Sequence, residues 1–336
     1  MNDITGMVRS GRLGDATDAI RRRLAGDAAP DAPAAERTMR DVTPARPAIE
    51  PPAGRARRPA APPRAAEGRI ERLEGPFAPL LYRPSAPAAE APLVVMLHGC
   101  TQDPEDFARG TRMNAAAEAH GAYVLWPGQS RGANPNGCWN WFDPAHQGAR
   151  GESAGLVALA LGALGRTGAD PRRLHVAGLS AGGAMAAVIA EARPDVVASI
   201  GIHSGLGAGA ASDMPAAFAA MGGRGPAPAA PRVPTLVIHG GADRTVAPAN
   251  AVAIAAAGRP PGAPRPRRRP GTEGGRRYAR TSVPAGPGAA AVELIEVEGL
   301  GHAWSGGAPE GTYADPAGPD ASALMMRFFL DHPRSR

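Results

Sequence analysis

The chain has 336 residues and a formal net charge of +6 at pH 7, and all 37 of its basic residues are arginine. Because P-loop NTPases, protein kinases and Schiff-base enzymes each depend on a lysine amine, the complete absence of lysine excludes these three classes. The 31 acidic residues, an aromatic content of only 4% and the lack of any motif that reads DNA or RNA argue against a nucleic-acid partner.

The first 68 residues differ in composition from the rest of the chain. Apolar residues at roughly helical spacing predict a short helix within residues 1–26. The Ala/Pro/Arg-rich stretch at 27–68 offers little apolar surface to offset the entropy of ordering it, which predicts a flexible linker. No Sec or twin-arginine signal is recognisable and no apolar run is long enough to span a bilayer, so the sequence alone predicts a cytoplasmic protein with no integral membrane segment.

Residues 69–333 alternate short apolar strands with helices and predict one catalytic domain. This alternation is typical of an α/β fold in which helices cover both faces of a mostly parallel central sheet. Strands are expected within 70–83 and at 92–98, 122–127, 174–178, 196–204, 235–240 and 291–299. Helices are expected at 107–120, 153–165, 182–191, 247–257 and 321–330.

The strongest local motif is Gly178-Leu179-Ser180-Ala181-Gly182, a G-x-S-x-G pentapeptide between a predicted strand and a predicted helix. In a sharp strand-to-helix turn the serine hydroxyl stands clear of the sheet, and the two glycines let neighbouring backbones pass closely. The motif predicts Ser180 as a nucleophile. The alternative is an ordinary glycine-rich turn.

Two further loops supply candidate partners for the serine. Asp243 follows the strand at 235–240, where a carboxylate can orient a histidine and stabilise its imidazolium, or can simply cap the next helix. His302 lies in a glycine-rich loop after the last strand. The order Ser180, Asp243, His302 is that of the catalytic triad in α/β-hydrolases.

The loop after the strand at 92–98 should complete an oxyanion hole. In α/β-hydrolases one donor is the backbone N–H that follows the nucleophile and the other comes from such an early loop, which assigns the donors to Ala181 and Cys100. His98 and His239 are interpreted as structural residues at strand ends. The remaining histidines lack metal-ligand spacing, so we expect no metal and no cofactor.

These segments together resemble the esterase family of short-chain polyhydroxyalkanoate (PHB) depolymerases with the type 1 catalytic domain. The resemblance covers about residues 69–331 and rests on LHGCTQ (97–102), CWNWF (138–142), VAGLSAGGAMAAV (176–188), HSGL (203–206), HGGAD-x-TV (239–246), GLGHAWSGG (299–307) and DPAGPDAS (315–322). It implies an α/β-hydrolase fold and a serine esterase that acts on short-chain 3-hydroxyacyl esters, with Ser180, Asp243 and His302 as its triad.

The resemblance also leaves alternatives open. The family is largely extracellular and its secreted members have a signal peptide and a polymer-binding domain, neither of which is recognised here. We therefore expect oligomers or other small esters as substrates rather than crystalline polymer. Feruloyl and acetyl esterases share the fold and triad. A non-catalytic protein attached to polymer granules, a peptidase and an acyltransferase are the further alternatives.

Aromatic residues near the motifs are candidate substrate contacts. Trp139, Asn140 and Trp304 lie in segments assigned to the mouth of the site, and flat apolar rings suit a hydroxyalkanoate chain. The alternative for Trp139 is that it fills the core behind its loop. Cys100 and Cys138 lie in two of the motifs, where a disulfide and a pair of free thiols are both open. The arginine cluster between 265 and 280 is interpreted as a solvated loop, and the alternative is a contact with an anionic substrate or surface.

Overall fold

The structure is a computed structural model that describes residues 68–335, apart from 260–261, 264 and 287–289. The helix predicted at 1–26 and the linker predicted at 27–68 therefore fall outside the described residues, save for Gly68. The extent of the predicted catalytic domain, 69–333, stays a prediction.

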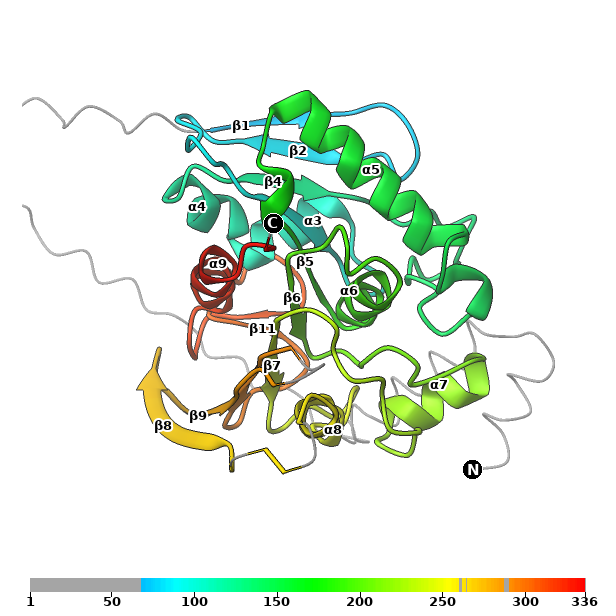
Figure 1. Ribbon diagram of the computed structural model, residues 1–336, viewed down its shortest axis with the longest axis vertical. Helices are drawn as coiled ribbons and strands as arrows, with labels where there is room; N and C mark the ends of the chain where they lie inside the picture. The colour runs from blue at the N-terminus through cyan, green and yellow to red at the C-terminus, as the bar shows by residue number, and fades with distance from the viewer. Residues whose placement is uncertain (1–67, 260–261, 264, 287–289, 336) are drawn as a thin grey trace, which may run out of the picture. The chain divides into compact units, whose positions relative to one another are not determined.

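A mixed ten-stranded sheet runs through the centre of the described residues in the order β1-β2-β4-β3-β5-β6-β7-β10-β9-β8 (Figure 1). The six middle strands from β4 to β10 are parallel, and an antiparallel pair flanks them at each edge. The strands are β1 (Arg69–Arg72), β2 (Leu80–Arg83), β3 (Leu93–Leu97), β4 (Tyr123–Trp126), β5 (Leu174–Leu179), β6 (Ser199–His203), β7 (Thr235–Gly240), β8 (Arg267–Glu273), β9 (Arg276–Val283) and β10 (Val292–Val297).

The strands β3 and β4 are apolar along their whole length because both of their faces are covered. In β3, Val94 and Met96 join the hydrophobic cluster on one side of the sheet, whereas Leu93, Val95 and Leu97 join the cluster on the other. A strand whose side chains are buried on both faces of the sheet has a continuous apolar sequence. This is why the sequence predicts these strands so clearly.

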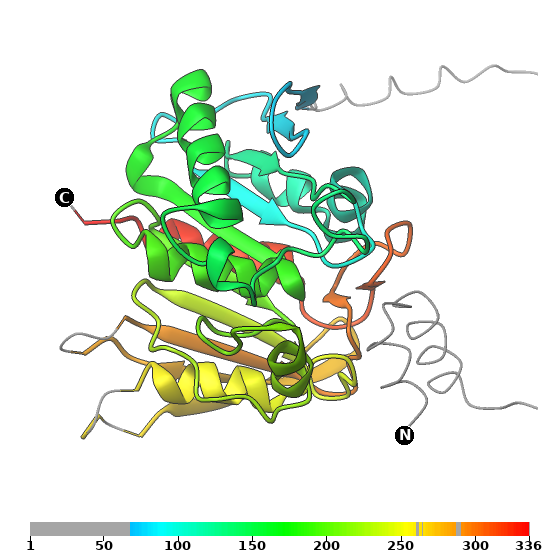
Figure 2. The ribbon, with the colours of Figure 1, turned by 90° about the vertical axis from the view of Figure 1, so that its right-hand side faces the viewer.

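Helices cover the two faces unequally. One face is covered by α5, α6, α7 and α8, and the other by α3, α4 and α9, as the two views show (Figures 1 and 2). The helices are α3 (Pro104–Thr111), α4 (Met113–Glu118), α5 (Gly151–Thr167), α6 (Ala181–Ala192), α7 (Met214–Met221), α8 (Ala249–Ala257) and α9 (Ala321–Asp331). Two short 3₁₀ turns (Pro144–His146 and Pro171–Arg173) and a small parallel pair, β11 (Trp304–Ser305) and β12 (Ala314–Asp315), complete the fold.

The helix predicted at 107–120 is two helices in the structure. Asp103 caps α3 by accepting a hydrogen bond from the Asp106 amide at 2.8 Å, and Pro104 occupies the first turn. Arg112 then adopts a left-handed conformation, with φ of 54°, and its amide bonds back to Ala108. This residue ends α3 and starts α4 in a new direction, which apolar periodicity alone does not indicate.

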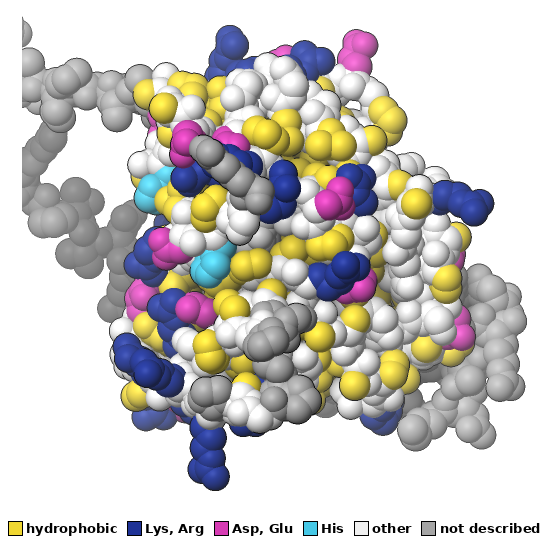
Figure 3. All heavy atoms as spheres, viewed as in Figure 1, with side chains coloured by type: hydrophobic (Ala, Val, Ile, Leu, Met, Phe, Trp, Pro, Cys, Tyr) yellow, Lys and Arg dark blue, Asp and Glu magenta, His cyan; other side chains and the backbone are white. Residues whose placement is uncertain are grey.

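The interpretation of the arginine cluster as a loop is wrong. Residues 267–283 form the β8–β9 hairpin, which extends the sheet beyond β10 and gathers basic side chains on the surface (Figure 3). Arg268, Arg277 and Arg280 pair with Glu296, Glu298 and Glu293. Because β8 is exposed on both faces, its sequence lacks the apolar alternation that predicts a strand, and its charges and Pro270 protect an open sheet edge.

Candidate active site

Ser180 occupies a strained turn between β5 and α6. Its φ of 57° and ψ of −120° are rare for a residue with a side chain, and its amide donates to His203 O at 2.9 Å. The flanking glycines make the turn possible, because a Cβ on Gly178 would lie 2.4 Å from the Gly182 carbonyl carbon. The G-x-S-x-G motif therefore forms the sharp strand-to-helix turn that the sequence predicts.

Asp243 and His302 form a carboxylate–imidazole pair in which the carboxylate is buried and the imidazole is half-buried. Asp243 follows β7, and its Oδ2 lies 2.8 Å from His302 Nδ1. Its Oδ1 accepts hydrogen bonds from the amides of Thr245 and Val246, both at 2.9 Å. Asp243 does not cap α8, which begins only at Ala249, so the capping alternative is wrong. The carboxylate instead fixes the orientation of the imidazole.

The charge state of Asp243 follows from its contacts. Burial raises the pKa of this carboxyl group, but the hydrogen bond and charge of His302 and the Val246 amide outweigh burial and hold the pKa below its ordinary value. An ionised Asp243 stabilises a protonated imidazole. No hydrogen bond joins the described side chains of Ser180 and His302 in this structure. Such contacts are often long in free enzymes and tighten when substrate binds.

His203 connects the serine turn to the histidine loop. Its backbone carbonyl accepts from Ser180 N, its Nε2 accepts from Ser305 N at 3.1 Å, and its ring stacks on Trp304 with centroids 4.9 Å apart. Burial, followed by the nearby charges of His239 and His302, lowers the pKa of His203 to about 3. The ring is therefore neutral at pH 7. The sequence places His203 in the HSGL block but gives it no role.

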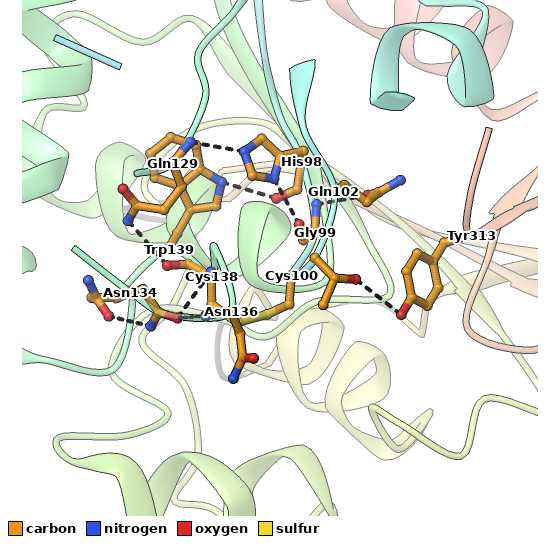
Figure 4. The surroundings of a disulfide bond; sticks show 12 residues. His98, Gly99, Cys100, Gln102, Gln129, Asn134, Asn136, Cys138, Trp139 and Tyr313 are labelled. Atoms are coloured by element: carbon orange, nitrogen blue, oxygen red, sulfur yellow. Dashed lines mark hydrogen bonds between the residues drawn. A yellow bond between two sulfur atoms is a disulfide. The ribbon is translucent and has the colours of Figure 1, made fainter. Parts of the chain in front are cut away.

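The loop after β3 is held from several sides, as Figure 4 shows. His98 Nδ1 lies 2.8 Å from Gly99 O, and its Nε2 accepts from the Gln129 amide at 3.0 Å. Gln102 accepts from Gly99 N at 3.0 Å through its side-chain oxygen. Among the described residues the amides of Cys100 and Ala181 have no hydrogen-bond partner. Both donors are thus free to bind an oxyanion, and their assignment to an oxyanion hole stays a prediction.

Cys100 and Cys138 form a disulfide, which settles in this structure the alternative that the sequence left open. The bond joins the loop after β3 to the 128–150 loop across 38 positions of sequence (Figure 4). The Thr101 amide, which donates to Asn136 O at 2.7 Å, adds a second link between the same two loops. The position of the Cys100 amide therefore depends on the second loop.

We expect the double substitution Cys100→Ser with Cys138→Ser to lower the free energy of unfolding by about 2–4 kcal/mol, because a cross-link of this span restricts the unfolded chain. Ester turnover should fall as well, since Cys100 carries a predicted oxyanion donor. Denaturant unfolding and steady-state kinetics of the double variant measure both effects. Equal stability and turnover in oxidised, reduced and doubly substituted protein would contradict this role.

The three predicted substrate contacts are not at the surface, so that prediction is corrected. Trp304 is 1% exposed and packs between Phe107 and His203, because it begins β11 and its ring faces inward. Trp139 is 0% exposed and donates to His98 O at 3.0 Å. Asn140 is buried against Glu152. These residues support the loops of the site rather than contact a ligand.

Two buried carboxylates that the sequence analysis passed over hold the surrounding loops. Glu152, in the first turn of α5, accepts from the side chain of Gln129 at 2.7 Å and from the Asn140 amide at 2.7 Å. Asp106 accepts from Gln102 Nε2 at 3.1 Å and from the Thr312 amide at 3.1 Å. Each carboxylate ties a helix to a loop of the site, and no local motif indicates such long-range partners.

Other buried polar groups lie apart from this site. His175 and Ser199 are hydrogen-bonded at 2.8 Å near the start of β5 and β6, at the end of the sheet opposite Ser180. Over the described residues, no group of three or more His, Cys, Asp or Glu side chains is arranged to hold a metal ion. No helix in the same part of the chain is long and apolar enough to cross a membrane.

The sheet order, the serine turn after β5 and the acid after β7 define the α/β-hydrolase fold. Residues 77–257 match the family described as esterase PHB depolymerase, and the chain belongs to that family. The chain is 36% identical over 183 residues to poly(3-hydroxyalkanoate) depolymerase C of Paucimonas lemoignei, an alignment of 50% of this chain and 44% of that protein. It is 35% identical over 140 residues to feruloyl esterase B of Neurospora crassa, covering 40% and 47%.

A solved structure supports the fold over a longer span. The acetyl xylan esterase of Aspergillus awamori matches 79% of this chain and 99% of its own length with a TM-score of 0.58 at 19% sequence identity. The chain spans less than half the length of the two relatives above. The match to the solved structure shows a shared fold, and the match to the family model shows which family the chain belongs to.

Proposed function

We propose that this protein is a serine hydrolase of carboxylic esters and that its substrates are short-chain 3-hydroxyacyl esters such as hydroxybutyrate oligomers. The observation that carries the proposal is the Asp243–His302 pair, at 2.8 Å, on the same edge of the sheet as the strained Ser180 turn. That arrangement supplies a nucleophile, a base and an acid that orients the base.

In the proposed acylation step, Ser180 Oγ forms a bond to the ester carbonyl carbon and its proton passes to His302 Nε2. The carbonyl oxygen becomes an oxyanion, which the amides of Cys100 and Ala181 stabilise. The C–O bond to the alcohol then breaks, and the alcohol leaves with the proton from His302. Asp243 stabilises the imidazolium throughout.

Deacylation repeats the sequence with water as the nucleophile. His302 takes one proton from water, the resulting hydroxide bonds to the acyl carbon, and the bond to Ser180 Oγ breaks as the serine regains its proton. The products are a carboxylic acid and an alcohol. The residues of the chain suffice for this chemistry without a cofactor.

Two classes of acyl ester are candidate substrates. The similarity to poly(3-hydroxyalkanoate) depolymerase C favours 3-hydroxyacyl esters, and the similarity to feruloyl esterase B, at nearly equal identity, makes feruloyl esters the second candidate. Hydrolysis of p-nitrophenyl butyrate by the purified chain tests the reaction itself. A granule-binding protein without catalytic activity would show no turnover of this ester.

A panel of hydroxybutyrate dimer and trimer, polymer film, methyl ferulate and acetylated xylan separates the substrate classes. We expect the highest kcat/KM on the hydroxybutyrate oligomers. If kcat/KM were tenfold or more higher on methyl ferulate than on the oligomers, a difference of about 1.4 kcal/mol in transition-state binding, the proposed substrate would be wrong. The proposed reaction would still hold.

A further inference from the structure

Tyr313 is a large aromatic residue that stands exposed beside His302. Its side chain is 42% exposed, and its ring meets the His302 imidazole edge to face, with centroids 6.2 Å apart and an interplanar angle of 80°. Its hydroxyl lies 3.4 Å from Thr101 Oγ1, and Thr101 belongs to the loop that carries the Cys100 amide (Figure 4). The ring thus lies between the histidine and the oxyanion loop.

Both members of this contact have strained backbones. Tyr313 has a φ of 51° and Thr101 a φ of 68°. Left-handed conformations are uncommon for residues with side chains and are true outliers for bulky or β-branched ones. Such strain persists only where the surroundings impose it, and it gathers at functional sites. Two strained residues that meet at their hydroxyl groups, one of them next to Cys100 and the other beside His302, are not an ordinary surface feature.

The backbone of Tyr313 is fixed on both sides. Before it, the Thr312 amide and hydroxyl donate to the buried carboxylate of Asp106. At the residue itself, the carbonyl accepts from the Trp304 amide at 2.7 Å, and the following residue, Ala314, pairs with Trp304 in the β11–β12 ladder. These bonds hold the loop in place while the left-handed turn directs the ring outward.

The position of the ring identifies the part of the substrate that it can reach. In the proposed reaction His302 returns its proton to the leaving alcohol, so the alcohol portion of the ester must lie against the imidazole. We propose that Tyr313, supported by Thr101, is a specificity-determining residue that contacts the alcohol portion of the substrate. This inference rests on the proposed ester hydrolysis. The rigid ring offers a large apolar surface to a bulky alcohol group at a small entropic cost.

The experiment compares esters that share the butyryl group and differ in the alcohol. Methyl butyrate and 4-nitrobenzyl butyrate are hydrolysed by the full chain and by Tyr313→Ala, Tyr313→Gly and Tyr313→Phe. Both truncations should reduce the preference for the nitrobenzyl ester, as a ratio of kcat/KM values, by about tenfold or more, mainly through KM. Tyr313→Phe retains the ring and should keep most of that preference.

The glycine variant separates the role of the ring from the stability of the loop. Glycine adopts a φ of about 50° freely, so Tyr313→Gly should melt at a higher temperature than Tyr313→Ala while losing the same preference. Phe218→Ala removes an exposed aromatic residue from α7, a helix that carries none of the site residues, and should leave the ratio unchanged.

Three outcomes are distinct. A lost preference in both truncations, with melting temperatures that differ, supports the inference. Equal losses on the two esters, through kcat, would overturn it, because the ring would then only support the His302 loop. Failure of the unsubstituted chain to hydrolyse either ester would overturn the proposed function itself.

A second series of methyl esters varies the acyl group among acetyl, butyryl and hexanoyl. The ratios of kcat/KM within this series should change little in the Tyr313 variants. A larger change there than in the alcohol series would assign the ring to the acyl side of the substrate.

Discussion

Replacing Ser180 with alanine should reduce kcat for p-nitrophenyl butyrate by about 10³-fold or more, because it removes the proposed nucleophile that forms the acyl-enzyme. His302→Ala should cost a similar factor. The double variant should be little worse than either single variant, since residues that act as a unit give losses that do not add. Steady-state kinetics of the three variants, with circular dichroism to confirm folding, measure this.

The acid of the triad has its own control. Asp243→Asn keeps the shape of the side chain but removes the charge that orients and stabilises the imidazole, so it should also cost orders of magnitude in kcat. Asp315 and Asp320, two acids that follow His302 in the sequence, are already engaged, one with Arg276 and one as the cap of α9. Near-normal turnover by Ser180→Ala or Asp243→Asn would contradict the assignment of the triad.

Replacing Gly182 with alanine should destabilise the fold by about 4 kcal/mol or more, at the high end for a single substitution. The added Cβ would lie 1.9 Å from Leu97 O and 2.5 Å from Leu97 C, and both of these atoms belong to the backbone of β3. No side chain can rotate to relieve the clash. Either β3 or the serine turn must shift, and chemical denaturation measures the cost.

Gly162 supplies a matched control. It lies within α5, and a Cβ built on it meets nothing within 4 Å. Because glycine in a helix interior costs conformational entropy, Gly162→Ala should raise the free energy of unfolding by about 0.5–1 kcal/mol. If the free energy of unfolding falls in Gly182→Ala and rises in Gly162→Ala, the loss at Gly182 is due to the close packing of the serine turn. A Gly182→Ala protein of normal stability would contradict it.

The sequence predicts best what depends on neighbouring residues. The strands β3, β5 and β7 are short and mostly apolar, and the Ser180 turn is encoded within five residues, so the sequence predicts both. The pairing of Asp243 with His302 is predicted from the chain order Ser180, Asp243, His302, which is the order of the triad in α/β-hydrolases. The structure brings the two side chains into contact across 59 positions of sequence.

The incorrect predictions concern features that depend on the direction of a side chain or on contacts with residues far away in the sequence. Trp304 lies two residues from His302 in the sequence, but closeness along the chain does not place its ring against a ligand. The start of β11 turns the ring into the core instead. Tyr313 escaped notice because a left-handed backbone angle leaves no pattern in the sequence. The β8–β9 hairpin was missed because strands exposed on both faces lack apolar alternation.

The central claim is that Ser180 is a nucleophile activated by His302, and covalent labelling tests it most directly. The protein is incubated with a fluorophosphonate, and the labelled residue is located by mass spectrometry of its peptides. We expect one adduct, on Ser180, formed in step with the loss of esterase activity and formed far more slowly in His302→Ala. Complete loss of activity with the adduct on another residue, or full activity with Ser180 completely labelled, would contradict it.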